Sequence, residues 1–425
     1  MFRPGTIASP GPSPPPSDGP VRKINPFNFT RATRSTPRDV NRQIALSLIR
    51  EHQPISRAEL ARRMAMSRGM VTALVNQLIA ESAIFEGEIG QSRRGRKPTL
   101  LYVRTHDRLA IGVDIRFSRT YVTLADFSGT QRSIETLETV FDPKALIQEL
   151  MKRFTRMIDA ENASERVEGI GLVVPGMVDR VTGRILNSPQ LGWRDVDIRQ
   201  GLESVSGYPV YIENAPIACA LAEMWLGQRG SAVTDFVYVT VSDGVGAGVV
   251  VNGQVVRGSA HTAGEFGHIP LNPDGPYCLC GARGCWEAYT SNLATVARYL
   301  GKPMTPDGAR AMLKGIDISF LDLITLARTG DLKARSALQE TGRCLGQGMS
   351  MIVNALNPSR IIVGGEITAA WDLVQEHIHA GISERSLTDR AAATPIIPEV
   401  ASRHPRLRGA TALVAGPVFA APQLA

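Results

Sequence analysis

The stretch that decides the fold runs from residue 264 to residue 287 and reads Gly264-Glu265-Phe266-Gly267-His268, then nine residues, then Cys278-Leu279-Cys280-Gly281-Ala282-Arg283-Gly284-Cys285-Trp286-Glu287. Three of the five cysteines lie within eight positions of one another, and a histidine stands just upstream. Three Cys and one His are the ligand set of a closed, tetrahedral structural zinc site. We therefore expect a Zn²⁺ ion to hold this loop in place.

Disulfide bonds and ordinary buried thiols are the alternatives to a metal at these cysteines. The sequence has no secretory signal, so nothing indicates an oxidising compartment. The odd number of cysteines and the Cys-x-Cys spacing also disfavour a simple disulfide framework. Glu265 and Glu287 are not needed as zinc ligands, so we expect these carboxylates, together with His268, to face a small polar ligand.

Length, composition and charge limit the class of protein. The 425 residues predict two or three domains, and a hydrophobic content of 43% is ample for their cores. No apolar run is long enough to span a bilayer, which predicts a soluble, cytoplasmic protein. Residues 1–105 carry 17 Lys/Arg against 7 Asp/Glu, whereas the remainder carries 30 against 33. This asymmetry indicates a polyanion-binding module fused to a near-neutral one, and a merely solvated basic surface is the alternative.

The basic part divides into a tail and a folded module. Residues 1–30 are Pro-rich, with seven prolines in the first twenty positions, and are predicted to be disordered. Residues 31–105 are predicted to form a winged helix-turn-helix, with its first helix near 38–50. Ser56 and Glu59 form a capping box that opens a second helix. Ser67 caps a third helix, whose apolar side is formed by Met70, Val71, Leu74, Val75, Leu78 and Ile79.

DNA-contacting side chains are expected on the third helix and on the wing. Residues 83–89 and 99–103 read as the two strands of the wing, and the tip between them carries Arg93, Arg94, Arg96 and Lys97. Arginine favours the negative potential of a narrow minor groove. On the third helix the candidates are Ser67, Arg68, Thr72 and Asn76. Arg68 suits guanine and Asn76 suits adenine. Phosphate contact or bare solvation is the alternative for each residue.

From about residue 106 the pattern changes to strands alternating with helices. Strands are expected at 110–115, 120–125, 167–174, 210–213, 236–241, 246–251 and before Gly364-Gly365. Helices are expected near 143–160 and 215–227. Strands that alternate with helices through Gly-rich turns favour an α/β architecture, with two lobes around a cleft.

These residues together resemble the ROK family, which contains repressors and sugar kinases, from about residue 38 to the C-terminus. The N-terminal winged helix makes the NagC/XylR-type regulators the most similar group. The resemblance rests on Ala263-Gly264-Glu265-Phe266-Gly267-His268 and on Cys278-x-Cys280-Gly281-x-x-Gly284-Cys285-x-Glu287. It implies an actin-like sugar-kinase fold over residues 106–425. Its first lobe would span about 106–227 plus a C-terminal helix, and its second about 228–410.

The resemblance also implies the ligands. Zinc would be bound by His268, Cys278, Cys280 and Cys285, and sugar hydroxyls by Gly176, Asn214, Glu265, His268 and Glu287. His268 would serve both roles with its two distinct ring nitrogens. Singly, Glu265 or Glu287 could instead be a surface carboxylate or a partner of the metal ligands, and Asn214 could cap the following helix.

Three positions depart from the pattern of the ROK kinases. Their catalytic base is an Asp directly after an Asn, but Ala215 follows Asn214 here. Their first phosphate loop is Asp-x-Gly-Gly-Thr, whereas this chain has Asp114-Ile115-Arg116-Phe117-Ser118, so side chains replace the glycines that let amides approach phosphate. Their Gly-Thr-Gly loop is Ser242-Asp243-Gly244 here. Phosphoryl transfer needs both a base and a phosphate cradle, so a sugar-binding domain without catalysis is expected.

The sequence thus predicts a sugar-responsive transcription regulator, a repressor rather than an activator, of carbohydrate-metabolism genes. It would bind operator DNA as a homodimer or tetramer and release it when a sugar binds. Two alternatives stay open. One is an active sugar kinase with a DNA-binding arm, and the other is a DNA-binding protein whose C-terminal domain only dimerises.

Overall fold

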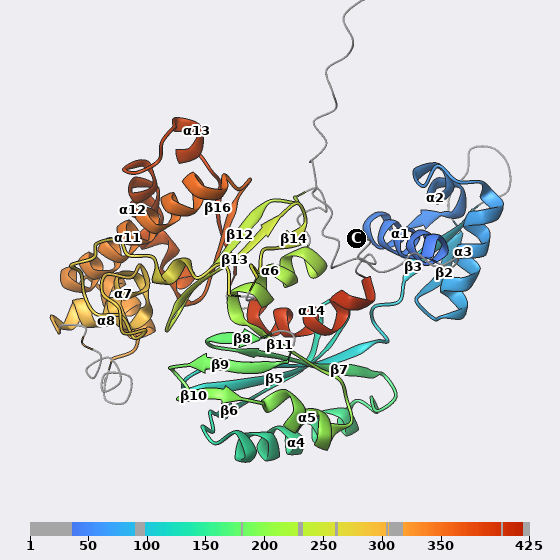
Figure 1. Cartoon of the computed structure of the whole chain (residues 1–425), viewed down its shortest axis with the longest axis horizontal. Coiled ribbons are helices and arrows are strands. Elements are labelled where there is room, and N and C mark those ends of the chain that lie inside the picture. The colour runs from blue at the N-terminus through green and yellow to red at the C-terminus, as the bar shows by residue number, and fades with distance from the viewer. Residues whose placement is uncertain are drawn as a thin grey trace, which may run out of the picture.

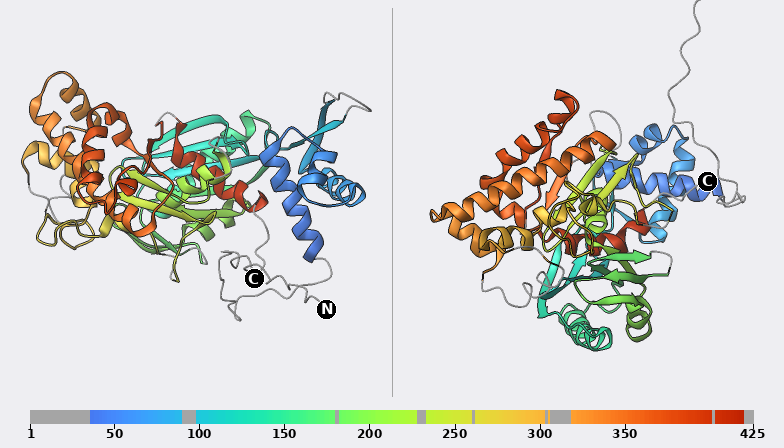
Figure 2. Two further views of the ribbon diagram at one scale, coloured as in Figure 1. Left: turned by 90° about the horizontal axis from the view of Figure 1, so that it is seen from above. Right: turned by 60° about the vertical axis from the view of Figure 1, so that its left-hand side comes forward.

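The computed structural model describes residues 36–89, 98–179, 182–227, 233–259, 262–302, 305, 318–400 and 403–419. A small N-terminal module lies at one end, and two α/β lobes follow it (Figure 1). Seen from above, module, first lobe and second lobe form a row, with the helices of the second lobe farthest from the module (Figure 2). None of the described helices combines the length and apolar composition that a membrane crossing needs.

The N-terminal module is a winged helix-turn-helix. Its elements are α1 (Thr36–His52), β1 (Ile55–Ser56), α2 (Arg57–Arg63), α3 (Arg68–Ala80), β2 (Ile84–Ile89) and β3 (Thr99–Val103). The side chains of Ser56 and Ser67 cap α2 and α3, accepting from the amides of Glu59 and Met70. The Glu59 carboxylate, expected to complete a capping box, instead forms ion pairs with Arg62 and Arg63. The short β1 joins the wing in the order β1-β3-β2, which the sequence did not reveal.

The first lobe is built on a sheet in the order β11-β7-β4-β5-β6. Its strands are β4 (Leu109–Ile115), β5 (Arg119–Asp126), β6 (Gln131–Glu138), β7 (Val167–Val174) and β11 (Val210–Asn214). A small second sheet contains β8 (Met177–Asp179), β9 (Arg184–Ser188) and β10 (Trp193–Val196). One face of the large sheet packs on α4 (Pro143–Ala160) and α5 (Ile198–Ser206). The other is covered by α6 (Ala215–Leu226) and α14 (Pro405–Phe419), as Figure 1 shows.

The second lobe has a sheet in the order β14-β13-β12-β15-β16. Its strands are β12 (Phe236–Val241), β13 (Val245–Val251), β14 (Gln254–Val255), β15 (Ile361–Gly364) and β16 (Ile396–Pro398). Its helices are η1 (Phe266–His268), α7 (Glu287–Thr290), α8 (Asn292–Leu300), α10 (Phe320–Arg328), α11 (Leu332–Leu356), η2 (Glu366–Ala370), α12 (Trp371–Ser383) and α13 (Asp389–Ala392). Helix α6 also packs on this sheet, so it lies between the sheets of both lobes.

The predicted fold class is confirmed, because a winged helix precedes two α/β lobes. The expected strands and the helices at 143–160 and 215–227 are present within one or two residues. The sequence did not predict the strands β1, β6, β8, β9, β10, β14 and β16. The C-terminal helix α14 packs on the sheet of the first lobe, and the exact bounds of the lobes stay a prediction.

Candidate functional site

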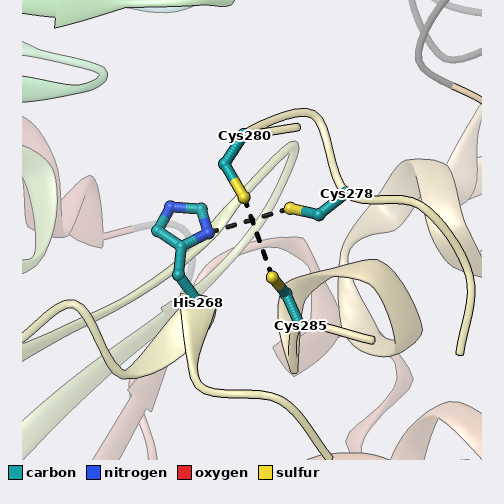
Figure 3. A group of neighbouring side chains, drawn as sticks. All are labelled: His268, Cys278, Cys280 and Cys285. Atoms are coloured by element: carbon teal, nitrogen blue, oxygen red, sulfur yellow. Dashed lines mark hydrogen bonds between the residues drawn. The ribbon is translucent and has the colours of Figure 1, made fainter. Parts of the chain in front are cut away.

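The four residues expected to bind metal lie together in one loop. His268 ends η1, and the three cysteines follow in a turn closed by hydrogen bonds from Cys278 N to Ala282 O and from Gly281 N to Cys278 O. Their side chains point toward one another (Figure 3), and one ligand atom from each lies within 4.8 Å of the others. Gly267 is required here, since a Cβ atom would lie 1.9 Å from the Val245 carbonyl oxygen of β13.

The spacing of these atoms fits a tetrahedral metal site. The distance is 3.7 Å from Cys278 Sγ to His268 Nδ1 and also 3.7 Å from Cys280 Sγ to Cys285 Sγ. Ordinary Zn–S and Zn–N bond lengths at tetrahedral angles require about 3.6 Å and about 3.8 Å for these pairs. The cluster can therefore hold a metal ion with little rearrangement.

Burial affects the protonation of the thiols. It raises the pKa of Cys285 to about 11. Burial also raises the pKa of Cys278, and the nearby Glu287 carboxylate adds to this shift. Because a metal binds the thiolate, a bound cation would reverse both shifts, and metal binding would release protons.

A cavity of about 220 Å³ opens beside this cluster, between the two lobes. All five predicted sugar residues line it: Gly176, Asn214, Glu265, His268 and Glu287. Because Nδ1 of His268 faces the cysteines, Nε2 is the ring nitrogen left for the cavity, and it lies 3.8 Å from Glu265 Oε2. Burial raises the pKa of Glu265, an effect that His268 opposes.

The side chains around the cavity are held by local contacts. Glu287 Oε2 accepts a hydrogen bond from the Val245 amide at 2.9 Å. A Cβ atom at Gly244 would lie 2.8 Å from this oxygen, so the absent side chain makes room for Glu287. Asn214 caps α6 by accepting from Ile217 N at 3.1 Å, as the alternative interpretation expected, and it lines the cavity as well. Its amide nitrogen is the part left to face a ligand.

The sequence of this chain matches a known protein family. A family model described as "ROK family" matches residues 110–416. The chain belongs to the ROK family. The match includes the cavity, the cysteine loop and both lobes, and it begins just after the winged helix.

Relatives of similar overall build share both parts of the chain. The xylose repressor of Bacillus subtilis is 29% identical over 393 residues, which cover 90% of this chain and 97% of the relative. A putative xylose repressor of Caldicellulosiruptor sp. is 30% identical over 367 residues, covering 82% of this chain and 88% of the relative. The transcriptional dual regulator NagC of Escherichia coli is 27% identical over 371 residues, which cover 85% of this chain and 88% of the relative.

Two solved structures share the fold of this chain to different extents. A ROK family transcriptional regulator, described as a homolog of E. coli MLC protein, matches with a TM-score of 0.74 at 24% identity and covers 90% of this chain and 97% of its own. A ROK family glucokinase from Streptomyces griseus, in complex with glucose and AMPPNP, matches with a TM-score of 0.60 at 26% identity. The match covers 71% of this chain and 98% of the glucokinase chain. The regulator thus shares the fold of nearly the whole chain, and the glucokinase shares a smaller part.

Of the three sites that depart from the ROK kinases, two contribute to the lining of the cavity, namely Ala215 and the turn Ser242-Asp243-Gly244 through Ser242 and Gly244. Ala215 opens α6 and lines the cavity beside Asn214. The turn that replaces the first phosphate loop is bound across the cleft, because Arg116 pairs with Asp114 at 2.7 Å and with Glu366 of η2 at 3.0 Å. In the other altered turn, burial and the neighbouring Glu366 raise the pKa of Asp243.

The predicted DNA-binding residues fall into two groups. Arg68, Thr72 and Asn76 are exposed on α3, which Ser67 caps. Asn76 Oδ1 accepts a hydrogen bond from Arg57 at 3.0 Å, so one acceptor site of its amide is engaged. The wing residues Arg93, Arg94, Arg96 and Lys97 lie outside the described residues.

Sequence reasoning missed several residues of the cavity. Asn187, Ser188 and Gln190 reach it from the end of β9 and the turn that follows, and Arg406 reaches it from the start of α14. The polar run Asn187-Ser188-Pro189-Gln190, directly after the apolar pair Ile185-Leu186, was a usable signal. Arg406 lies far away in the sequence and carried no such signal.

Proposed function

We propose that this ROK protein is a sugar-responsive transcriptional repressor whose kinase-like domain binds a sugar without phosphorylating it. The observation that carries the proposal is the cavity, because all five residues predicted to contact a sugar line it together with Ala215, which stands where the ROK kinases have their catalytic Asp. The names of the relatives support it, since they include xylose repressors and NagC. A repressor works where the chromosome is, so the proposal implies a cytoplasmic protein.

The chemistry of the cavity suits a small polyhydroxylated ligand. Carboxylates accept hydrogen bonds from sugar hydroxyls, and the Asn214 amide donates to them. Convergent polar groups in a partly apolar cleft select such ligands because each unmatched group costs binding energy. We infer that the cysteine cluster binds Zn²⁺, which fixes the loop carrying Glu265 and Glu287, with His268 joining metal and sugar through separate nitrogens.

Catalysis is not part of the proposal. An alanine accepts no proton from an attacking hydroxyl, and Arg116 and Phe117 stand where the ROK kinases have the glycines whose amides cradle phosphate. Asp243 adds a carboxylate in the second altered loop. These three differences favour sensing over phosphoryl transfer.

The DNA side of the proposal rests on the winged helix. Helix α3 would enter the major groove with Arg68, Thr72 and Asn76, and the basic wing tip would contact the minor groove or phosphates. One such helix reads few base pairs, so we propose a homodimer or tetramer that reads two half-sites.

A sugar panel tests the binding half of the proposal. Melting temperature would be measured with D-xylose, D-glucose and N-acetyl-D-glucosamine, on wild type and on Glu265→Gln and Asn214→Ala variants. At least one sugar should raise the melting temperature of wild type, and both variants should lose most of that shift. An ATP-coupled phosphorylation assay runs in parallel. Turnover would restore the kinase alternative, and a melting temperature unchanged by every sugar would favour a domain that only dimerises.

A further inference from the structure

A chain of ion pairs joins the two lobes and ends at Arg406, which lines the cavity. Arg116, at the turn after β4, pairs with Asp114 of its own lobe and with Glu366 of the second lobe. Glu366 also accepts a hydrogen bond from Asn292 Nδ2 at 3.2 Å, at the start of α8. Asp114 is fully buried, and its other oxygen lies 2.9 Å from Nε of Arg406. One connected set of charges therefore joins the second lobe to the first turn of α14.

Helix α14 carries this connection to the winged helix. It spans fifteen residues, which is about 22 Å of helix. Its last carbonyl groups lack partners within the helix, and α1 supplies donors for two of them. Gln43 Nε2 donates to Val418 O at 3.0 Å, and Ser47 Oγ donates to Phe419 O at 3.4 Å. Figures 1 and 2 show the end of α14 beside α1.

Helix α6 runs between the same two regions. Asn214 and Ala215 at its start line the cavity, and Trp225 near its end lies under Arg50 of α1, whose Cζ atom is 4.7 Å from the indole ring. Arg50 also lies 5.2 Å from the ring of Phe419, so its side chain contacts both helices.

The two helices are packed too closely to slide independently. A Cβ atom at Gly409 of α14 would lie 2.7 Å from the backbone of Ala218 in α6, and one at Gly416 would lie 2.9 Å from Trp225. The buried side chains of α1, namely Ala45, Leu46 and Ile49, share one core with Val414, Ala415 and Phe419. Interlocked packing of this kind moves as a body or rearranges between discrete states.

We propose that the Glu366–Arg116–Asp114–Arg406 chain and the α6–α14 pair form the mechanical link through which lobe closure changes the DNA-binding module. Closure of the lobes changes the Arg116–Glu366 contact. Helix α14 then moves because Arg406 is paired with Asp114, and α1 moves with α14 through its contacts at Gln43, Ser47 and Arg50. This inference rests on the proposed function, because it assigns the route by which the sugar acts on DNA binding. Such a route is established only by a measured coupling between the two sites.

The coupling factor is the ratio of the DNA dissociation constants with and without a sugar. It is measured by fluorescence anisotropy on a duplex selected from a random pool by the wild-type protein, with D-xylose, D-glucose and N-acetyl-D-glucosamine as probes. Wild type should show a factor of about ten or more, within the usual range for allosteric proteins. Glu366→Gln and Arg50→Met should each lower it to about threefold or less, while sugar binding without DNA stays within about twofold of wild type.

Glu384→Gln is the matched control. Glu384 pairs with Arg343 at 2.8 Å on the surface of the second lobe, away from the chain of contacts. The same chemical change there should leave the coupling factor at its wild-type value. Full coupling in both Glu366→Gln and Arg50→Met would overturn the proposal.

Hydrogen–deuterium exchange gives a readout that needs no sugar. Glu366→Gln should increase deuterium uptake in peptides from α14 and α1, which the proposed link connects to Glu366 through Arg116, Asp114 and Arg406, whereas Glu384→Gln should not. Unchanged uptake in both helices would also overturn the link. If no sugar alters DNA binding of wild type while this exchange effect is present, the proposed function fails and the mechanical link stands.

Discussion

Cys280 illustrates how much depends on single residues of the metal loop. It is the exposed cysteine of the cluster, whereas Cys278 and Cys285 are buried, so Cys280→Ser removes a ligand without opening a buried cavity. We predict that this variant loses the roughly one equivalent of zinc per chain expected of wild type and, with it, the sugar-dependent thermal shift. Metal content by mass spectrometry and melting temperature check both.

Cys219→Ala is the control for this variant, since Cys219 is a buried core thiol of α6 outside the cluster. It should keep the metal. A Cys280→Ser protein that retains both zinc and the sugar response would show that Cys280 is not a required metal ligand and would contradict this account of the loop.

Asp243 provides a pH-dependent prediction. Its pKa is raised in the folded protein by burial and by Glu366. A carboxyl with a higher pKa in the folded state favours folding while it is protonated, so its contribution is present at low pH and is lost as the pH rises through the folded pKa. Each pKa unit corresponds to about 1.4 kcal/mol. Asp243→Asn should therefore raise the melting temperature at pH 8, with the gain shrinking toward pH 4.

Melting curves of both proteins across this pH range provide the measurement, with Asp159→Asn, at an exposed position on α4, as the baseline. A gain that is the same at every pH would mean that Asp243 acts through shape or packing instead of charge.

At the scale of elements, two helical glycines allow opposite predictions. An alanine at Gly409 would press on α6 at 2.7 Å, whereas an alanine at Gly69 of α3 would meet nothing within 4 Å. Overpacking costs about 1–3 kcal/mol, and alanine in place of glycine stabilises an exposed helix by up to about 1 kcal/mol. Gly409→Ala should lower the free energy of unfolding and Gly69→Ala should raise it, as denaturant titration can determine. Equal effects of one sign would contradict the packing of α14 on α6.

The basic residues of the wing tip are expected from the sequence to contact DNA. Replacing Arg94 and Arg96 together by alanine should weaken DNA binding and flatten its salt dependence by about two units of the log–log slope. Binding titrations at several salt concentrations measure the slope, with Arg343→Ala in the second lobe as control. An unaltered slope would remove the wing tip from the interface.

Helices and strands were predictable where a continuous stretch of sequence carries their apolar pattern. The apolar side of α3 and the strands before Gly364 and Pro175 are continuous patterns, and the cysteine loop is one short stretch. Strand β6 escaped because only Ile134 and Leu137 are apolar within it, as suits an edge strand that is mostly exposed. The Arg116–Glu366 pair could not be predicted, because 250 positions separate its members and only the tertiary fold brings them together.

The whole molecule joins a DNA-binding module to a cavity through shared packing. The winged helix shares a core with the C-terminal helix, so its position depends on the first lobe. The cavity contains residues of both lobes, so a ligand there favours one arrangement of them over others. On the proposed function, this arrangement would let a bound sugar alter DNA binding without phosphoryl transfer.

The most direct test of this account is an anisotropy titration of the full-length protein on DNA from upstream of its own gene, against a scrambled duplex, at two salt concentrations. It is run with and without D-xylose, D-glucose and N-acetyl-D-glucosamine. The account predicts specific binding that one sugar weakens by about tenfold or more. Specific binding that every sugar leaves unchanged, together with ATP-dependent phosphorylation of one of them, would contradict it.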